Sequence, residues 1–472
     1  MISVHKQRVK YVVVDYIATN LAWFLYNWLR WLMGNVAGFV SLQSFYLSGT
    51  VLLGQLFFPL GAMGIYYLSG YYNEVFRKSR LQELLTTAGS AFINSLIIFF
   101  VALLNDVVLN DRTVNYEMIL MLWLSLFVFT YTGRSLLTNH TTRQIQKRRW
   151  QFRTLVVGAG AQGYSFVQRM ERQKLGTGNE VVGFVAIPGE NNVKDINRPI
   201  YDIDDMETVV QRRQIEEIIV VPSRGNEGDL LRVVDSLYPL NIPIKITPDR
   251  NNILLSKTRM TSFYGDPLVD VSISSMSESQ KNIKRVIDVA TSLLLMLALS
   301  PLYAVIAIMI KLNSKGPVIY RQERVGYHNK PFIIYKFRSM IDNAEGSGTP
   351  QLSSETDPRI TPVGRFLRKY RLDELPQFYN VLKGDMSLVG PRPERRYYVD
   401  QLVKYRPAYS LVHRVRPGIT SMGQVKFGYA ENLEEMIERL DYDLLYLDNM
   451  SVLTDLKILV YTMKIVFTGK GV

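Results

Sequence analysis

Residues 286–312 read VIDVATSLLLMLALSPLYAVIAIMIKL, an apolar run long enough to cross a membrane, with Ser300 and Pro301 near its midpoint. Proline removes a backbone hydrogen bond and collides with the preceding turn, so a break is expected there. Both flanks are basic: Lys281, Lys284 and Arg285 precede the run, and Lys311, Lys315, Arg321 and Arg324 follow it. Because cytoplasmic flanks retain basic residues, we predict a re-entrant helix hairpin that enters and leaves on one face, with Ser300 capping backbone groups at the break. The alternative is an ordinary span with a kink.

Four other apolar runs lie nearer the N-terminus, at about 11–33, 51–72, 88–104 and 118–137. Their lengths are close to the roughly 20 helical residues that cross a bilayer. Lys and Arg gather before the first run and after the second and fourth, whereas the other two connections hold only one Arg. The sequence therefore predicts a four-helix transmembrane domain in residues 1–150, with the N-terminus and everything after residue 140 in the cytoplasm. The first run lacks a cleavage site of small residues, so we do not expect a removable signal peptide.

Composition limits the chemistry. The 472 residues include 55 Lys and Arg, 42 Asp and Glu, four His and no Cys. Disulfides, thiolate nucleophiles and Cys-ligated zinc are therefore excluded, which leaves carboxylates, basic side chains and oxygen-loving ions such as Mg²⁺. Much of the net charge of +13 flanks apolar segments, where it suits anionic membrane lipids. Because the basic residues form no single stripe, no nucleic-acid partner is expected.

Residues 151–271 alternate short apolar runs with amphipathic stretches, a pattern typical of a parallel α/β sheet. Gly158, Gly160 and Gly163 form a Gly-rich turn directly after the first predicted strand. Such a loop can cradle the phosphates of a nucleotide cofactor, or it can simply permit a tight turn. No acidic residue clearly ends the second strand, and Glu190 comes too late for a confident ribose ligand. The polar stretch 272–282 is the expected linker to the next domain.

The remainder of the chain carries a series of short motifs rich in Arg, Pro and Gly. In order, they are Gly316-Pro-Val-Ile-Tyr-Arg-Gln322-Glu-Arg324-Val-Gly326, Lys336-Phe-Arg338-Ser-Met340, Asp357-Pro-Arg359-Ile-Thr361, Arg371-Leu-Asp373-Glu374-Leu-Pro376-Gln377, Met386-Ser-Leu-Val-Gly390-Pro-Arg392-Pro-Glu394 and Arg416-Pro-Gly-Ile-Thr420. Together, directly after a Pro-broken apolar segment, they closely resemble the bacterial sugar transferase family, the polyprenyl-phosphate hexose-1-phosphate transferases or monotopic phosphoglycosyl transferases. The resemblance covers about residues 280–470, and the preceding parts are similar to the N-terminal half of the long members.

This resemblance implies a membrane protein in three parts. An α-helical N-terminal bundle would be followed by an α/β Rossmann-like domain with a nucleotide-binding or regulatory role. A small α/β catalytic domain with the re-entrant hairpin would occupy residues 280–472. The implied enzyme transfers a hexose-1-phosphate from a UDP-sugar to undecaprenyl phosphate in the bacterial inner membrane, releases UMP and starts capsule, exopolysaccharide or O-antigen synthesis. A homodimer is a reasonable expectation for a long member, and the sequence does not identify the hexose.

Asp373 and Glu374 are the candidate catalytic pair. Pro376 disfavours helix at Leu375, so we predict that the pair lies at a helix end where a side chain can point into a cleft. In the resembled family the matching Asp is the nucleophile, which carries the phosphosugar covalently before the lipid phosphate displaces it. The matching Glu binds Mg²⁺. The alternative interpretation is a solvated acidic pair at a helix end.

Phosphosugar transfer between two polyanions needs positive charge and a metal, because donor, nucleophile and acceptor repel one another. Arginine suits this role through its bidentate geometry. The candidate substrate-binding residues are Lys336, Arg338, Arg359, Arg368, Arg371, Arg392 and Arg416. For each arginine taken alone, the alternative is a contact that holds a loop or faces anionic lipid.

Two other classes of protein compete with the transferase interpretation. A membrane-bound, NAD-dependent nucleotide-sugar dehydratase or epimerase would need a Tyr-x-x-x-Lys motif near the Gly-rich turn. Tyr379 and Lys383 have that spacing but lie over 200 residues beyond the turn, so we interpret the match as chance. A non-enzymatic membrane assembly protein would not require the dense C-terminal motifs. The last segment, 450–467, is predicted to be either an amphipathic helix at the membrane surface or part of the core.

Overall fold

In the computed structural model of the protein, the described residues are 4–33, 39–76, 78–103, 112–173, 176–187, 190, 192–193, 197–221, 233–234, 236–240, 242–247, 268–270, 276–342, 357–428 and 430–468. Contacts between residues divide the chain into two units. The first comprises Met1–Gln151, Gln173–Asn179 and Ser277–Asn282, and the second comprises Phe152–Arg172, Glu180–Met276 and Ile283–Val472.

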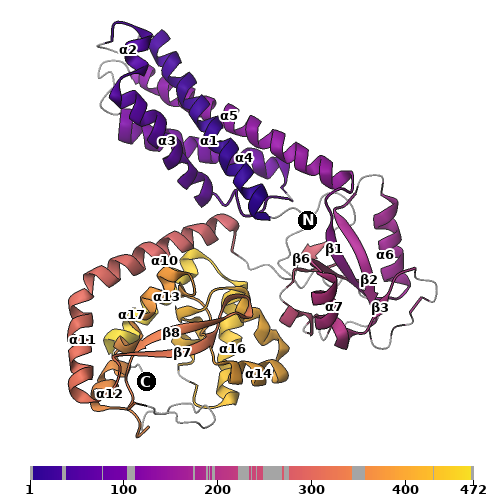
Figure 1. Ribbon diagram of the computed structural model, residues 1–472, viewed down its shortest axis with the longest axis vertical. Helices are drawn as coiled ribbons and strands as arrows, with labels where there is room; N and C mark the ends of the chain where they lie inside the picture. The colour runs from indigo at the N-terminus through magenta and orange to yellow at the C-terminus, as the bar shows by residue number, and fades with distance from the viewer. Residues whose placement is uncertain are drawn as a thin grey trace. The chain divides into compact units, whose positions relative to one another are not determined.

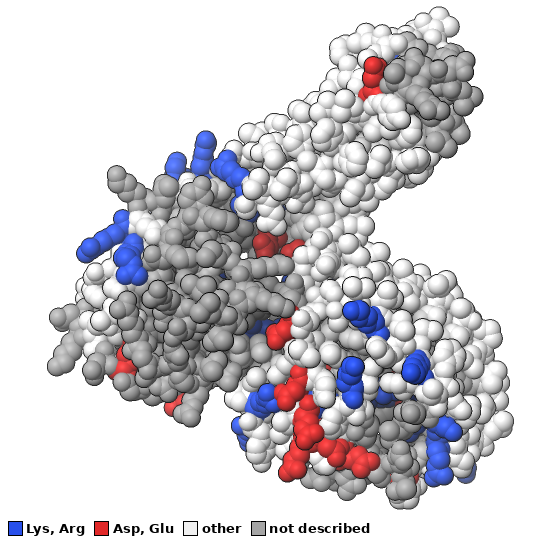
Figure 2. All heavy atoms as spheres, turned by 180° about the vertical axis from the view of Figure 1, so that it is seen from behind, with Lys and Arg blue, Asp and Glu red and all other residues white. Residues whose placement is uncertain are grey.

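The first unit is a bundle of helices (Figure 1). The helices are α1 (Val4–Leu32), α2 (Leu42–Tyr46), α3 (Gly49–Leu68), α4 (Arg80–Ile98), its π-helical continuation η1 (Phe99–Leu103) and α5 (Arg112–Gln146). In the described part of the chain, three single helices are long and apolar enough to cross a membrane: Gly49–Leu68, Arg80–Val101 and Tyr116–Gln146. Figure 2 shows the visible described surface of this bundle almost free of charged side chains. These helices correspond to the second, third and fourth predicted spans.

The first predicted span also forms a helix, α1, but it is not among the three helices above, so its crossing of the membrane stays a prediction. Helix α1 is less apolar than those three helices because it contains Asp15, Asn20 and Asn27. Its polar face turns inward, where Asp15 and Arg134 of α5 form a fully buried ion pair with an oxygen to nitrogen distance of 2.7 Å. Arg134 also donates to Thr87 of α4 at 2.9 Å. Charged residues within apolar bundles are usually paired in this way, because an unpaired charge there is costly.

The first part of the second unit is the predicted α/β sheet (Figure 1). Its strand order is β3-β2-β1-β4-β5-β6, parallel except for β6, which runs antiparallel to β5. Apolar side chains fill both faces of the sheet, as expected for near-continuous apolar strands in a parallel sheet. The elements are β1 (Phe152–Val157), α6 (Ala161–Arg172), β2 (Asn179–Val185), β3 (Ile200–Tyr201), η3 (Ile203–Asp205), α7 (Met206–Arg213), β4 (Glu217–Val220), η4 (Tyr238–Leu240), β5 (Ile244–Ile246) and β6 (Val269–Asp270).

The C-terminal part of the second unit carries the motifs singled out above. It contains the antiparallel hairpin β7–β8 and the short parallel pair β9–β10, surrounded by helices. The elements are α10 (Glu278–Ala298), α11 (Ser300–Asn313), β7 (Ile319–Val325), η5 (Tyr327–Asn329), β8 (Pro331–Phe337), α12 (Pro362–Lys369), η6 (Leu372–Glu374), α13 (Gln377–Lys383), β9 (Ser387–Val389), α14 (Arg396–Tyr405), η7 (Pro407–Arg414), β10 (Gly418–Thr420), α15 (Met422–Lys426), α16 (Leu433–Asp448) and α17 (Val452–Thr468).

The apolar run 286–312 is broken where the sequence predicts. Helices α10 and α11 meet at an angle of 62° beside Ser300 and Pro301, as Figure 1 shows. Because Pro301 has no N–H, the carbonyl of Leu297 loses its usual helical partner, and the hydroxyl of Ser300 donates to that carbonyl at 2.8 Å instead. The break is therefore confirmed. Both a broken span and a re-entrant hairpin have this shape, so the membrane topology stays a prediction.

Helix α17 covers most of the last predicted segment. Asp455 and Ile458 are buried, and Ile458 joins a hydrophobic cluster with Leu388 and Val389 of β9. The opposite face exposes Leu456 and other apolar residues, among them Val460, Met463 and Phe467. One face therefore packs in the core, while the other has the apolar character predicted for a surface-seeking helix.

Candidate active site

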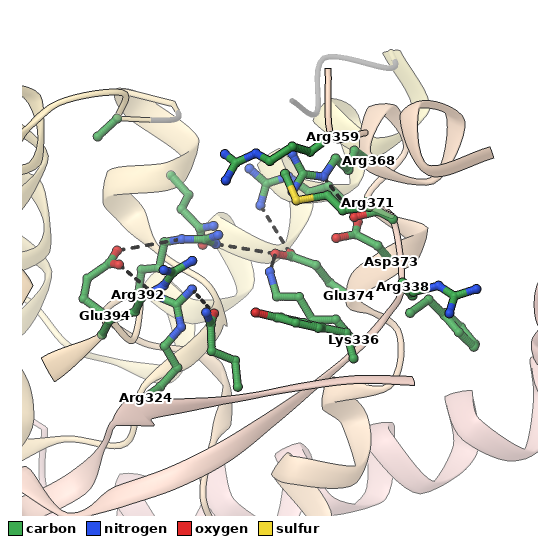
Figure 3. A pocket seen from close by; sticks show the side chains of 18 of the residues that line it. Arg324, Lys336, Arg338, Arg359, Arg368, Arg371, Asp373, Glu374, Arg392 and Glu394 are labelled. Atoms are coloured by element: carbon green, nitrogen blue, oxygen red, sulfur yellow. Dashed lines mark hydrogen bonds and ion pairs between the residues drawn. The ribbon is translucent and has the colours of Figure 1, made fainter. Parts of the chain in front are cut away.

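A pocket of about 380 Å³ opens between the hairpin β7–β8, the turn η6 and the helices α14 to α16 (Figure 3). Asp373 and Glu374 both line it. So do six of the seven predicted substrate-binding residues, which are Lys336, Arg338, Arg359, Arg368, Arg371 and Arg392. Segments far apart in the sequence thus bring cations and carboxylates together in one cavity.

Asp373 and Glu374 lie on η6, a single helical turn between α12 and α13. The chain enters this turn through Arg371, whose φ of +53° lies in the left-handed region, and leaves it at Pro376. The predicted position at a helix end is confirmed, although Leu375 itself has helical angles despite preceding a proline. Both carboxylates are buried, at 7% and 8% exposure, so the alternative of a solvated acidic pair is wrong.

Glu374 is surrounded by cations (Figure 3). The Nζ of Lys336 donates to its Oε1 at 3.0 Å, and a nitrogen of Arg392 lies 3.5 Å from the same oxygen. A nitrogen of Arg371 lies 3.7 Å from its Oε2. Lys336 comes from β8, and Arg392 comes from the loop after β9.

The two neighbouring carboxyls differ in their electrostatics. Burial is the largest cause that raises the pKa of Asp373 above the ordinary aspartate value, while Lys336 opposes the rise and the charge of Glu374 adds to it. Burial acts in the same direction on Glu374, but the cations around it outweigh burial and hold its pKa below the ordinary value. Glu374 is therefore a fixed anion, whereas Asp373 has the higher proton affinity of the pair.

A second buried carboxylate, Glu394, holds another group of arginines. Arg324 of β7 binds it at 3.0 Å, and Arg439 of α16 donates to it at 2.7 Å. Arg392 lies 4.0 Å from Glu394 and thus between the two carboxylates of the pocket, as Figure 3 shows. The arrangement Glu374, Arg392, Glu394 links the wall near η6 to the wall formed by β7 and α16.

The predicted arginines have different local roles. Arg359 binds Asp357 through both carboxylate oxygens, and the Nε of Arg368 donates to the hydroxyl of Ser339 at 3.0 Å. Arg416 is not in the described pocket lining, and its Nε donates to the carbonyl of Gly384 at 2.9 Å. The prediction that Arg416 belongs to the site is therefore unsupported by the geometry, because that backbone contact holds its side chain elsewhere.

Arg338 combines a structural contact with free donors. It is 5% exposed, and its side chain points away from Glu374 (Figure 3). One nitrogen donates to the backbone carbonyl of Ser314, just after α11, at 2.7 Å. Its Nε and Nη1 are buried and have no hydrogen-bond partner among the described residues. Buried guanidinium donors of this kind suit an anionic ligand.

Comparisons with known proteins identify the family of the chain. A family model described as bacterial sugar transferase matches residues 279–469, and one described as CoA-binding domain matches residues 68–248. The chain is 33% identical over 318 residues to the UDP-glucose:undecaprenyl-phosphate glucose-1-phosphate transferase of Escherichia coli (strain K12), which covers 67% of this chain and 68% of that protein. The chain belongs to the bacterial sugar transferase family.

Two other relatives are similar to this chain over smaller shares of their lengths. This chain is 46% identical over 189 residues to the UDP-N-acetylgalactosamine-undecaprenyl-phosphate N-acetylgalactosaminephosphotransferase of Aeromonas hydrophila. That match covers 40% of this chain and 44% of that protein. This chain is also 36% identical over 269 residues to the UDP-glucose:undecaprenyl-phosphate glucose-1-phosphate transferase of Klebsiella pneumoniae, and that match covers 57% of each chain. The match thus spans about half the length of these two proteins.

Part of this pocket could not be predicted from the sequence. Glu394 lies in a motif that drew attention to its arginine, but nothing in the sequence marked it as the partner of Arg439. Arg439 and Gln424 also line the pocket, from α16 and α15, and neither belongs to a motif with a recognised chemical role. The one available signal was that Arg439 is charged on the inward face of an amphipathic helix, where it is 5% exposed.

The carboxylates fit a magnesium ion only with help from a substrate. Among the described residues, no group of three or more His, Cys, Asp or Glu could hold a metal ion. Mg²⁺ often takes only one or two carboxylates from a protein, with substrate phosphates and water completing its coordination. The donor set of Asp373 and Glu374 fits that pattern.

The Gly-rich turn lies at the start of α6, as predicted. Gly158 has a φ of +117°, and a Cβ at Gly163 would collide with the carbonyl of Gly158, so both positions require glycine. A Cβ at Gly160 would collide with the carboxylate of Glu190. An acidic side chain thus lies where phosphates approach such turns in nucleotide-binding domains. Cofactor binding at the three glycines stays a prediction.

Proposed function

We propose that this protein transfers a hexose-1-phosphate from a UDP-sugar to undecaprenyl phosphate and releases UMP, as the first step of capsule, exopolysaccharide or O-antigen synthesis. The observation that carries the proposal is the buried pair Asp373 and Glu374 in a pocket lined with arginines. The relatives support the proposal, because their names give a UDP-sugar and undecaprenyl phosphate as substrates. The relatives differ in their sugars, so the hexose stays open.

In the first half of the proposed reaction, a carboxylate oxygen of Asp373 attacks the phosphorus that bears the sugar. A bond forms between that oxygen and phosphorus, and the bond to the bridging oxygen of UMP breaks, so UMP leaves as an anion. Lys336, Arg371 and Arg392 surround Glu374 beside the nucleophile and would stabilise the charge that develops on the phosphoryl oxygens. Arg338 lines the same pocket, but its guanidinium points away from Glu374 and donates to Ser314, so we assign it no phosphate contact in this step.

In the second half, an oxygen of the lipid phosphate attacks the same phosphorus and the bond to Asp373 breaks. The products are the lipid diphosphate sugar and the regenerated carboxylate. Splitting the transfer in two lets one pocket serve a soluble donor and a lipid acceptor in turn. Glu374, with the donor phosphates, would hold Mg²⁺, which supplies positive charge against the repulsion between anions.

The proposed membrane arrangement follows from the same assignment. The acceptor is a lipid, so the pocket must face the membrane surface, which the bent pair α10–α11 and the exposed apolar face of α17 would contact. We expect an inner-membrane protein with the pocket on the cytoplasmic side, surrounded by membrane lipids, and a homodimer is compatible with this arrangement. The dehydratase alternative has no observation in its favour, since Tyr379 is half exposed on α13 and Lys383 binds Asp385 at 3.0 Å.

The test is UMP release by the purified protein in lipid nanodiscs, with Mg²⁺, undecaprenyl phosphate and a panel of UDP-sugars. Without the lipid acceptor, mass spectrometry should find one phosphosugar on the protein. Asp373→Asn should abolish both signals without loss of folding, whereas the control Asp385→Asn, outside the described pocket lining, should keep both. Substantial turnover by Asp373→Asn would refute the nucleophile assignment. An NAD-dependent change of the sugar without UMP release would refute the proposed function.

A further inference from the structure

Gln424 lines the pocket and carries a buried amide oxygen. It lines the same cavity as Asp373 and is 4% exposed. Its Oε1 is buried and has no hydrogen-bond partner among the described residues. Buried carbonyl oxygens in native proteins are almost always hydrogen-bonded, because an unpaired one keeps the full cost of losing its water. The wall of the pocket therefore contains an acceptor that lacks a donor among the described residues.

The backbone at Gln424 is held from two sides. The hydroxyl of Ser421 accepts a hydrogen bond from the backbone N–H of Gln424 at 3.0 Å and caps α15. The N–H of Gly423 donates to Asp443 of α16 at 3.0 Å, and a Cβ at Gly423 would lie only 2.6 Å from the side chain of Arg439. Helix α15 is thus packed closely on α16, which limits movement of Gln424 toward another protein partner.

The chemistry of this part of the pocket differs from that around Glu374. Tyr398, Ala430 and Met436 line the pocket and belong to one hydrophobic cluster with α14 and α16. An uncharged carbonyl oxygen repels the oxygens of a phosphate and attracts an O–H or N–H group. The phosphates of a donor therefore belong with the cations near Glu374, and a neutral part of the donor belongs with Gln424.

We propose that Oε1 of Gln424 accepts a hydrogen bond from a neutral O–H or N–H group of the nucleotide-sugar donor, which makes Gln424 a residue that binds and discriminates donors. The inference rests on the proposed function. A UDP-sugar offers two such groups, a sugar hydroxyl and the imide N–H of uracil. A pocket built to accept a hydrogen bond discriminates against molecules that lack the donor group, because its own polar atom would stay unpaired.

The experiment compares Gln424→Met, which removes the amide and keeps a side chain of similar length, with the wild type. Gln401→Met on α14, outside the described pocket lining, is the matched control. Steady-state UMP release is measured with UDP-glucose, UDP-galactose and UDP-N-acetylgalactosamine, and UMP is titrated as an inhibitor. We expect the KM for the preferred donor to rise roughly tenfold in Gln424→Met, with a smaller change in kcat, since one neutral hydrogen bond contributes about that factor. Gln401→Met should behave as wild type.

The UMP titration distinguishes the two possible groups. A raised KM with unchanged inhibition by UMP assigns the contact to a sugar hydroxyl, whereas a parallel weakening of UMP inhibition assigns it to uracil. Unchanged KM and unchanged UMP inhibition would overturn the inference. If thermal unfolding shows that Gln424→Met is not folded, Gln424→Asn, which retracts the carbonyl by one methylene, takes its place with the same expectations.

Failure of the proposed function gives a different result, because the wild type would then release no UMP from any donor. The inference is in that case tested by calorimetric binding of UMP and UDP-glucose to the same variants in nanodiscs. Weaker binding by Gln424→Met than by Gln401→Met supports it. Equal binding, or no binding to the wild type, overturns it.

Discussion

The Nζ of Lys336 lies 3.0 Å from Oε1 of Glu374 in the buried centre of the pocket. The same cation lowers the pKa of the neighbouring Asp373, against the effect of burial. Lys336 therefore affects both members of the pair, although it lies on a different element, β8. Its removal should change the pH dependence of the reaction as well as its rate.

We expect the rate of UMP release to fall with decreasing pH, with a midpoint above the ordinary aspartate pKa of about 3.9. The reason is that burial raises the pKa of Asp373, and only the deprotonated carboxylate attacks phosphorus. Lys336→Met should move the midpoint of the kcat/KM profile to higher pH, because it removes a charge that favours the carboxylate. Lys383→Met, which removes a lysine outside the described lining, should leave the profile in place. Identical profiles for wild type and Lys336→Met would contradict the assignment.

Removal of the break should change the topology of the segment 286–312. The double variant Ser300→Ala with Pro301→Ala restores an N–H at position 301 that can donate to the carbonyl of Leu297. It therefore favours one continuous helix long enough to cross the bilayer. Part of the population should then place the chain after residue 312 on the outer side, and UMP release should fall in proportion.

The readout uses the lack of native cysteines. Single cysteines in place of Lys281 and Lys315 should both be labelled only from the cytoplasmic side in the native background. In the double variant, the second should become partly accessible from outside. Outside labelling in the native background would show a span, and a fully cytoplasmic, fully active double variant would show that the flanking charges or packing fix the geometry.

The buried pair Asp15 and Arg134 should dominate the stability of the helical bundle. Asp15→Ala leaves Arg134 without its carboxylate in an apolar bundle, and loss of one partner from a buried pair typically costs about 3–5 kcal/mol. The double variant Asp15→Ala with Arg134→Leu should cost less, because no unpaired charge is left. Unfolding in detergent, followed by circular dichroism, measures both. A larger loss in the double variant would show that packing of Arg134 matters more than its charge.

Glu190 should weaken nucleotide binding at the Gly-rich turn. Its carboxylate lies against Gly160, and two unit charges about 4 Å apart repel by about 1 kcal/mol even in water. Glu190→Gln should therefore bind NADH or coenzyme A at least about fivefold more tightly than the wild type. Calorimetry on the full chain measures this, with Glu180→Gln on the exposed side of β2 as control. Equal affinities would show that the charge of Glu190 does not weaken nucleotide binding at the turn.

Local features were predictable from the sequence because their causes are local. Pro301 removes a helical hydrogen bond between two residues that are only four positions apart, and the 62° bend lies at this break. The same holds for the Gly-rich turn, where Gly158 and Gly163 meet steric limits set by the adjacent backbone. The alternation of apolar runs likewise predicted the parallel sheet, since both faces of such a sheet are buried.

The partners of charged residues depended on the tertiary structure. Arg416 stands in a motif like those of the other arginines, yet its side chain binds the carbonyl of Gly384 outside the described lining of the pocket. Asp15 interrupts an apolar run, and an unpaired carboxylate there would be costly inside the bundle. Its partner is Arg134, which lies 119 residues later in the chain. A charge can be buried only when an opposite charge lies at the right place, and the fold alone decides that.

The sequence by itself determined the broken apolar segment, the order of the motifs and the choice of Asp373 and Glu374 as the candidate pair, because each rests on residues adjacent in the chain. Only the tertiary structure decided that Glu394 holds Arg324 and Arg439, and that Gln424, with an unpaired amide oxygen, lines the same cavity. Hydrogen bonds and ion pairs act over about 3–4 Å in space and are indifferent to separation along the chain. For that reason motifs can name candidate reacting groups, while the other residues that line the pocket around them are found only when the helices and strands are packed.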